Sequence, residues 1–187
     1  MIQPAWQTAR LTIRDAVQTD APALQSILES IADTLRVEGK ESIARDAMKR
    51  MIEEGELPPA GTRDRFRLQA ILSKEADACV GYLGVYHGFP HADTLYICTL
   101  TIAKQHRGKG YGTEVVRAIR EMPLCEEFPS LRLWVSLNNW AALRFWIAQG
   151  FANITAFTGT RVYGHNATAG LELESAAAAH DRMEEVL

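Results

Sequence analysis

The run from Gln105 to Gly112, Q-H-R-G-K-G-Y-G, is the part of this chain whose residue types and spacing best indicate chemistry. It follows an apolar, strand-like segment at 95–102 and opens a helical pattern at 112–122. Its three alternate glycines leave their backbone N–H groups unshielded, and the first turn of a helix adds unpaired donors and a positive dipole end. One arginine and one lysine lie beside them. The run therefore predicts a cradle for a pyrophosphate group.

Two common phosphate sites do not fit this spacing. A P-loop requires G-x-x-x-x-G-K-[ST], which the sequence does not contain. A dinucleotide fingerprint requires G-x-G-x-x-G and an acidic residue about 20 positions later. Here the spacing is G-x-G-x-G, and the acidic residues downstream, Glu126 and Glu127, stand in a proline-bounded loop. A glycine-rich turn that binds no ligand remains an alternative for the triplet taken alone.

Periodic patterns predict the elements that position this run. Alternating apolar and polar residues favour strands, and apolar residues three and four apart favour helices. Strands are predicted at 8–14, 66–73, 79–86, 95–102, 131–136, 154–158 and 169–174. Helices are predicted at 20–35, 43–52, 112–122 and 139–149, with a loosely attached helix at 176–187. This order predicts an α/β (α+β) fold, a mixed sheet with helices on both faces.

Length and composition limit the class of protein. At 187 residues the chain is large enough to bury about 70% of its unfolded surface, so we predict one domain, 1–175, followed by a C-terminal helical tail, 176–187. A net charge of −3 does not favour a nucleic-acid partner. The three cysteines are widely spaced and lack C-x-x-C pairing, which predicts neither a metal site nor disulfides. No membrane span or signal pattern is present, so the predicted location is cytoplasmic.

The run is part of a longer pattern. Residues 100–110 read L-T-I, then Q-x-x-G-x-G, which resembles the acyl-CoA-binding signature of the GNAT N-acetyltransferase superfamily. The segment 131–151 resembles that superfamily's sequence of strand, N-x-x-A, helix and G-F, and L-T-I-R-D-A at 11–16 resembles its opening strand. The resemblance covers most of 8–157. It implies a GNAT-like acyl-CoA acyltransferase fold with a mostly antiparallel sheet of six to seven strands.

The resemblance also implies where acetyl-CoA, the cosubstrate, would bind. The strands that end at Ile102 and Ser136 are implied to splay apart, and the pantetheine arm would pair with the backbone between them like an added strand. A backbone N–H near Leu100 would polarise the thioester carbonyl. Asn139 would reach the pantetheine, or else be a simple helix N-cap. The residues implied to bind the cofactor are Leu100, Thr101, Ile102, Arg107, Gly108, Lys109, Gly110, Tyr111, Gly112, Thr113 and Asn139.

Two positions depart from the family pattern. Trp146 stands where many members carry a tyrosine that is thought to protonate the departing thiolate, and an indole N–H cannot act as that acid. The alternative for Trp146 is a plain core residue. Tyr96 stands where some members carry a glutamate base. Tyr96 is our candidate catalytic residue, as the anchor of a water molecule, and its alternative is a half-buried aromatic of the sheet.

The sequence does not identify the acceptor. In the superfamily the first inter-helix loop often lines the acceptor site, and we expect the segments 33–42 and 55–64 to shape it. Acidic residues in the first segment would suit a cationic amine. Other candidate bases, each with the alternative of a solvated surface group, are Glu38, Glu41, His87, His91 and Asp93.

These observations lead to three functional expectations, the third of which is a nucleotide-binding domain unrelated to CoA. The first is an acetyl-CoA-dependent N-acetyltransferase, in which an amine of a small molecule or peptide attacks the thioester directly. The second is a catalytically weak GNAT-fold module that binds acyl-CoA and regulates, since the usual acid and base are missing. A homodimer is a further possibility, because closing strands often pair between subunits in such folds.

Overall fold

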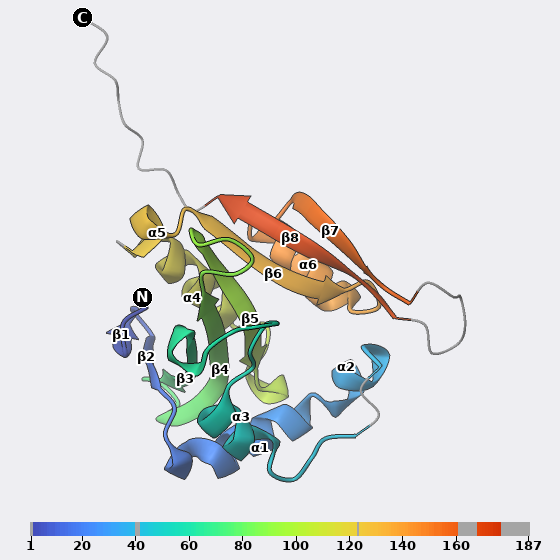
Figure 1. Ribbon diagram of the computed structural model, residues 1–187. Helices are drawn as coiled ribbons and strands as arrows, with labels where there is room; N and C mark the ends of the chain where they lie inside the picture. The colour runs from blue at the N-terminus through green and yellow to red at the C-terminus, as the bar shows by residue number, and fades with distance from the viewer. Residues whose placement is uncertain (1, 40–41, 123, 161–167, 177–187) are drawn as a thin grey trace, which may run out of the picture.

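The computed structural model describes residues 2–39, 42–122, 124–160 and 168–176 (Figure 1). The strands are β1 (Ala5–Gln7), β2 (Leu11–Asp15), β3 (Phe66–Ser73), β4 (Ala78–His87), β5 (Thr94–Ile102), β6 (Ser130–Ser136), β7 (Asn153–Gly159) and β8 (Ala169–Ala176). The α-helices are α1 (Ala21–Ser30), α2 (Ala32–Val37), α3 (Ala47–Glu54), α4 (Tyr111–Arg120), α5 (Leu124–Glu127) and α6 (Trp140–Ala148). Short 3-10 helices cover Gln18–Asp20, Arg63–Arg65 and Lys104–His106.

The strands form one eight-stranded sheet in the order β1-β2-β3-β4-β5-β6-β8-β7. Every neighbouring pair is antiparallel except β5 and β6, which are parallel. The predicted mixed, mostly antiparallel sheet is confirmed, although it has one strand more than the six to seven expected. The parallel pair requires a crossover, and α4 with α5 supplies it between β5 and β6.

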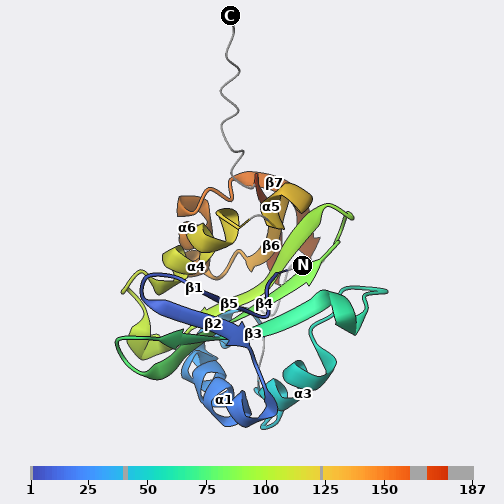
Figure 2. The ribbon, with the colours of Figure 1, turned by 90° about the vertical axis from the view of Figure 1, so that its left-hand side faces the viewer.

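Helices cover both faces of the sheet, as predicted. Figure 2 shows α1 and α3 on one side of the strands and α4 and α6 on the other. Each pair buries its own apolar stripe. Leu24, Ile27 and Met48 pack with one core cluster. A larger cluster on the opposite face contains Val115 and Ile119 of α4, together with residues of α6.

Several elements differ from the sequence prediction. β1 was not predicted because three residues are too few to show alternation. It pairs with β2, so β2, which lies in the strand predicted at 8–14, is an interior strand. The helix predicted at 20–35 is interrupted at Ile31, whose φ and ψ are −109° and 16°. α5 lies where a loop was expected. Ala176 ends β8, and the rest of the predicted C-terminal tail lies outside the described residues.

Candidate active site

The run 105–112 forms a 3-10 turn, an exposed loop and the first residues of α4. Gly108 and Gly110 have φ angles of 76° and 81°, a conformation that residues with a Cβ rarely adopt. Gly110 is the N-cap of α4, so the N–H groups at the start of the helix have no acceptor within it. The positive end of the helix dipole lies at the same point. This backbone has the geometry of an anion cradle, although binding of a phosphate there remains a prediction.

The three glycines of the run have different structural roles. A Cβ at Gly108 would meet no atom within 4 Å, so its φ angle alone calls for glycine. A Cβ at Gly112 would instead lie 3.2 Å from Cζ of Phe145 in α6. Gly112 therefore lets α4 and α6 approach closely. Its predicted contact with a phosphate group has no separate support in this geometry and stays a prediction.

The two cationic side chains predicted to flank the phosphate behave differently. Arg107 Nε donates to the carbonyl of Ile102 at 3.1 Å, which ties the loop to the end of β5. The Lys109 side chain is exposed, whereas its backbone carbonyl accepts a hydrogen bond from Arg10 at 3.0 Å. Both residues are exposed, so each can still present a cationic group at the cradle.

Tyr111 and Thr113 begin α4. Tyr111 is buried, and its hydroxyl lies 3.2 Å from Oγ of Ser73, so the ring anchors the loop to the core. Only its backbone can face a ligand. The Thr113 hydroxyl accepts a hydrogen bond from Gln149 at 3.3 Å and is otherwise exposed. The predicted cofactor contacts of both residues remain predictions.

The parallel strands β5 and β6 pair only over their first halves. Their register runs from Thr94 opposite Ser130 to Ile97 opposite Leu133, although β5 continues to Ile102. Beyond these pairs β6 leads away from β5 toward the lower right of Figure 1, together with β8 and β7. The divergence of the two strands predicted from the family resemblance is thus confirmed. We call this opening the β5–β6 divergence.

A bulge in β5 lies at the start of this divergence. Gly84 pairs with Thr99 and Val85 with Ile97, so Cys98 is the extra residue. Bulges bend a strand and often re-aim groups next to active sites. Burial raises the pKa of the Cys98 thiol, which therefore stays protonated at neutral pH and is not an activated nucleophile.

The register of β5 shows where its backbone groups point. Ala103 N–H donates to the Val80 carbonyl at 2.9 Å, one step beyond the pair of Gly81 and Ile102. Hydrogen-bonded residues of an antiparallel pair alternate with residues whose backbone groups face the other side. Leu100 and Ile102 therefore direct their N–H and C=O groups away from β4, toward the β5–β6 divergence. This is the orientation that pantetheine pairing would need.

Thr101 lies between these residues and faces the other way. The same alternation directs its backbone toward β4, and its hydroxyl lies 3.3 Å from that of Thr99 in a buried position. The structure thus offers no free group of Thr101 to the divergence. Its predicted role in binding the cofactor stays a prediction.

The segment from α1 to α2 contacts the residues that follow each of the two diverging strands. At one end Ser30 Oγ accepts from the backbone N–H of Lys104, and Asp33 forms an ion pair with the Lys104 side chain at 3.8 Å. At the other end Glu38 accepts a hydrogen bond from Nδ2 of Asn139 at 2.6 Å. Lys104 follows β5, and Asn139 follows β6. The predicted acceptor segment therefore borders the open end of the divergence.

Asn139 has two partners within the protein. Its Oδ1 accepts from the backbone N–H of Ala142 at 3.0 Å, which confirms the N-cap of α6. Its amide nitrogen donates one hydrogen to Glu38, and a second N–H remains on the same nitrogen. The cap and a pantetheine contact are therefore compatible in geometry.

The two positions that depart from the family pattern are both partly or fully packed. Trp146 is 7% exposed and lies edge-on between Phe145 and Phe151, with ring centroids 4.9 and 5.2 Å away. This supports its alternative as a core residue. Tyr96 is half-buried against Phe89 and opposite Arg132, one pair before the divergence. Burial, followed by the charge of Glu172, raises the pKa of the Tyr96 hydroxyl, so it is a hydrogen-bond donor and not a base.

Among the other candidate bases, His87 has a structural role. Its Nε2 accepts from the backbone N–H of Ile2 at 2.8 Å, so Nδ1 carries the proton and donates to the carbonyl of Arg65 at 3.0 Å. Burial lowers its pKa. His87 lies at the end of β4 that pairs with Leu95, far along β5 from Ile102. It is therefore not placed to take a proton at the divergence.

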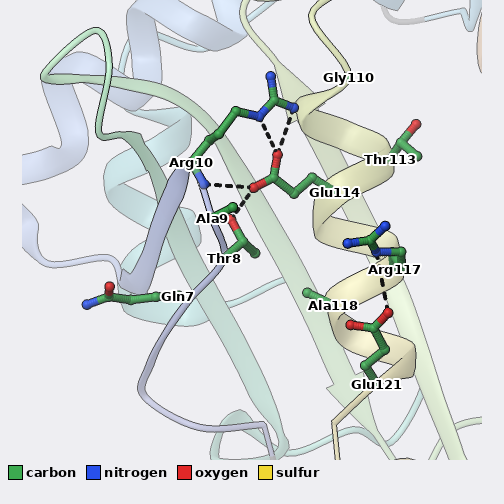
Figure 3. A pocket seen from close by; sticks show the side chains of 10 residues that line it. All are labelled: Gln7, Thr8, Ala9, Arg10, Gly110, Thr113, Glu114, Arg117, Ala118 and Glu121. Carbon is green, nitrogen blue, oxygen red and sulfur yellow. Dashed lines mark hydrogen bonds and ion pairs between the residues drawn. The ribbon is translucent and has the colours of Figure 1, made fainter.

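Two groups of charged residues were missed at the sequence level. Arg10 and Glu114 form an ion pair beside the cradle, and they line a cavity of about 530 Å³ together with Arg117 (Figure 3). Arg132 pairs with Glu172 and Glu174 on the sheet surface beside Tyr96. No local spacing marks either group, because the partners are 40 to 104 positions apart.

A sheet that opens between two parallel strands beside a glycine-rich anion cradle defines the class as an α/β acyltransferase of the GNAT type. A family model described as the acetyltransferase (GNAT) family matches residues 28–151, and the chain belongs to that family. The family supports acyl-CoA-dependent N-acetyltransferase activity in general, with acetyl-CoA as the usual cosubstrate. No curated protein matches the chain significantly.

Solved structures share the fold. An acetyltransferase from Thermus thermophilus is 21% identical, with a TM-score of 0.66 over 90% of this chain and 99% of that one. A GNAT-family acetyltransferase from Bacillus anthracis is 13% identical, with a TM-score of 0.70 over 92% and 98%. A ribosomal-protein-alanine N-acetyltransferase from Brucella melitensis is 19% identical, with a TM-score of 0.64 over 88% and 98%. At these identities the likeness concerns the fold alone.

The described residues contain neither a membrane-crossing helix nor a cluster of metal-binding side chains. No helix among them is long and apolar enough to cross a membrane. Within the same residues, no group of three or more His, Cys, Asp or Glu side chains is arranged to hold a metal ion.

Proposed function

We propose that this protein transfers an acetyl group from acetyl-CoA to an amine of a small molecule or peptide by direct attack. The observation that carries the proposal is the β5–β6 divergence beside the cradle. The backbone groups of Leu100 and Ile102 face that opening, and the free amides at the start of α4 lie at its end. Together they would bind pantetheine as an added strand and pyrophosphate at a helix N-terminus.

The chemistry requires little beyond positioning. The amine nitrogen attacks the thioester carbonyl carbon, and the C–S bond breaks as the acetyl group moves to nitrogen. The N–H of Leu100, which points into the divergence, would stabilise the oxyanion. A thiol with a pKa of about 8.5 is a fair leaving group, so an enzyme without a dedicated acid at Trp146 can still turn over.

The next step is removal of the proton from the attacking amine. The Tyr96 hydroxyl, with its raised pKa, would hold a water molecule by donating to it, and that water would pass the amine proton to bulk solvent. An α-amine with a pKa near 8 is about a tenth neutral at pH 7, whereas a lysine amine is almost wholly protonated. We therefore propose an acceptor with a lowered amine pKa.

Release of free CoA thiol tests the proposal. The purified protein is incubated with acetyl-CoA and a panel of α-amines, polyamines and aminoglycoside-like amines, with tertiary amines as a control that cannot be stably acetylated. Turnover with a primary amine and none with the tertiary control is the expected result. CoA binding without turnover on any amine would reject the enzyme and favour the regulatory acyl-CoA-binding module, for which the buried Trp146 is the supporting observation.

Two further parts of the proposal concern the whole protein. We expect a cytoplasmic location and a homodimer, the latter through the edge strand β7, where Ile154 and Phe157 are 48% and 76% exposed. Light scattering during size-exclusion chromatography measures the mass in solution. A mass near 20.8 kDa at high concentration would reject the dimer.

A further inference from the structure

The guanidinium group of Arg10 contacts Lys109 and Tyr111 of the anion cradle and lies close to Gly110 between them. Its NH1 donates to the carbonyl of Lys109 at 3.0 Å. Its NH2 lies 3.4 Å from the position that a Cβ of Gly110 would take, and its Cζ lies 4.9 Å from the ring centroid of Tyr111. Figure 3 shows Arg10 reaching from the turn between β1 and β2 to the start of α4. The contact therefore joins segments 99 positions apart.

Glu114, in the first turn of α4, holds this guanidinium in place. Its Oε2 accepts from Arg10 Nε at 2.8 Å and lies 2.7 Å from NH2. Its Oε1 accepts from the Arg10 backbone N–H at 3.0 Å and from the Thr8 hydroxyl at 2.5 Å. Burial raises the pKa of Glu114, but these hydrogen bonds outweigh it and leave the pKa below its ordinary value. The carboxylate is thus ionised at neutral pH, and its side chain is only 13% exposed.

The turn that carries Arg10 is itself fastened to the sheet. Thr8 Oγ1 accepts from the backbone N–H of Leu11 at 3.0 Å. Lys74, in the turn between β3 and β4, donates its backbone N–H to the Arg10 carbonyl at 3.0 Å and its Nζ to the Thr8 carbonyl at 2.8 Å. Arg10 therefore approaches the cradle from a fixed support.

The hydrogen bond to Lys109 has a consequence for the next amide. The carbonyl of Lys109 and the N–H of Gly110 belong to one peptide unit, and in a trans peptide they point in opposite directions. Because the carbonyl points at Arg10, the N–H points away from the β1–β2 turn. Gly112 and Glu114 are two positions apart in α4, about 200° around the helix, so Gly112 lies on the side that faces away from Arg10. There Gly112 packs on Phe145 of α6, and α6 follows the diverging strand β6.

We propose that Arg10 is a positioning residue for acyl-CoA binding, which holds the Lys109 carbonyl so that the Gly110 N–H is directed at the bound pyrophosphate. This inference rests on the proposed function. Glu114 balances the charge of Arg10, so Arg10 acts by orienting the amide and not by attracting the anion. Lys109, with its exposed side chain, supplies attraction instead.

The difference between orientation and attraction can be measured. Calorimetry with CoA is run on the full chain and on Arg10→Gln, Arg10→Lys, Lys109→Gln and Arg117→Gln, at low and high salt. We expect Arg10→Gln to raise the Kd for CoA about tenfold at both salt concentrations. The variant should misdirect the Gly110 N–H, and the loss of its hydrogen bond to the charged pyrophosphate has an effect of about that size. Arg10→Lys keeps the charge and should recover only part of the affinity. The effect of Lys109→Gln should shrink at high salt.

Arg117→Gln is the matched control. Arg117 lines the same cavity, is 76% exposed and pairs with Glu121 at 3.4 Å, so its removal takes away one arginine without touching the loop. Its Kd for CoA should stay within about twofold of the wild type. In turnover assays Arg10→Gln should raise KM for acetyl-CoA and leave KM for the amine unchanged. Hydrogen exchange of the ligand-free protein should accelerate at 108–112 and not in β3 or β4.

A wild-type protein that binds CoA, with an Arg10→Gln variant of equal affinity, would overturn the positioning role and leave the proposed function intact. An Arg10→Gln effect that vanishes at high salt would also overturn it, in favour of simple charge attraction. Faster exchange throughout the sheet would make Arg10 a general stabilising residue. A wild-type protein that binds no CoA would reject the proposed function, and with it this inference.

Discussion

Replacing Asn139 separates two roles of its side chain at the open end of the divergence, the cap of α6 and the hydrogen bond to Glu38. Its Oδ1 caps α6 by accepting from Ala142, and its Nδ2 donates to Glu38 at 2.6 Å. Asn139→Ala removes both interactions, whereas Asn139→Ser keeps a capping oxygen and removes the donor. A capping oxygen is worth about 1 kcal/mol. A hydrogen bond to a half-buried carboxylate is worth about 1–2 kcal/mol.

These values give distinct stability changes for the two variants. We expect Asn139→Ala to lower the free energy of unfolding by about 2–3 kcal/mol and Asn139→Ser by about 1–2 kcal/mol. At roughly 2–4 °C per kcal/mol, Asn139→Ala should lose about 4–12 °C in Tm. Urea titration with unchanged m-values measures the difference. Equal losses in the two variants would refute the cap, and a wild-type-like Asn139→Ser would refute the bond to Glu38.

The same variants test the contact with pantetheine. Since the second N–H of Asn139 is left for a ligand, Asn139→Ser should raise the Kd for CoA about fivefold. Glu38→Gln is the control, because it keeps an acceptor for Asn139 and should leave the affinity for CoA within about twofold. An Asn139→Ser variant with wild-type affinity would assign this residue to the cap alone.

Three further predictions follow from buried or strained positions. Burial lowers the pKa of His87, so as pH falls through about 6.5 the unfolded chain binds a proton that the folded chain does not. The free energy of unfolding should therefore decrease from pH 7 to 5, and His87→Gln should flatten that slope in urea titrations. Trp146→Tyr should not raise kcat in the thiol-release assay, and it should cost about 1–3 kcal/mol because the new hydroxyl enters an apolar aromatic cluster. The methyl group added by Gly108→Ala meets no neighbour, so the variant should lower the free energy of unfolding by only about 1–2 kcal/mol, the cost of the left-handed φ. Its binding of CoA, measured by calorimetry, should also weaken.

The central part of the fold could be predicted because its signals are local. The strand-like runs at 66–73 and 95–102 and the helical stripe of Val115 and Ile119 each identify an element from a few neighbouring residues. The break at Ile31 could not be predicted, because the apolar stripe continues across it from Leu28 to Leu35. β1 was missed for a different reason, since three residues carry too little pattern.

The candidate site could also be predicted only in part. The cradle was recognisable because it is built from consecutive backbone groups whose conformation requires glycine at Gly108 and Gly110. The contacts that hold the cradle come from Arg10, and those that border the acceptor side come from Glu38. Such pairs have no spacing to detect, since the fold alone brings them together.

The donor site is easier to predict than the acceptor site for a physical reason. A pantetheine arm and a pyrophosphate are recognised mainly by backbone N–H and C=O groups, so many side chains are compatible with the same donor site. An amine acceptor has to be recognised by side chains, and those beside the divergence come from different elements. Glu38 lies on one side of the divergence, and Tyr96 lies at its start with Arg132 and Glu172 beside it. Substitutions on the acceptor side should therefore change KM for the amine and leave the affinity for CoA unchanged, whereas substitutions at Arg10 should do the reverse.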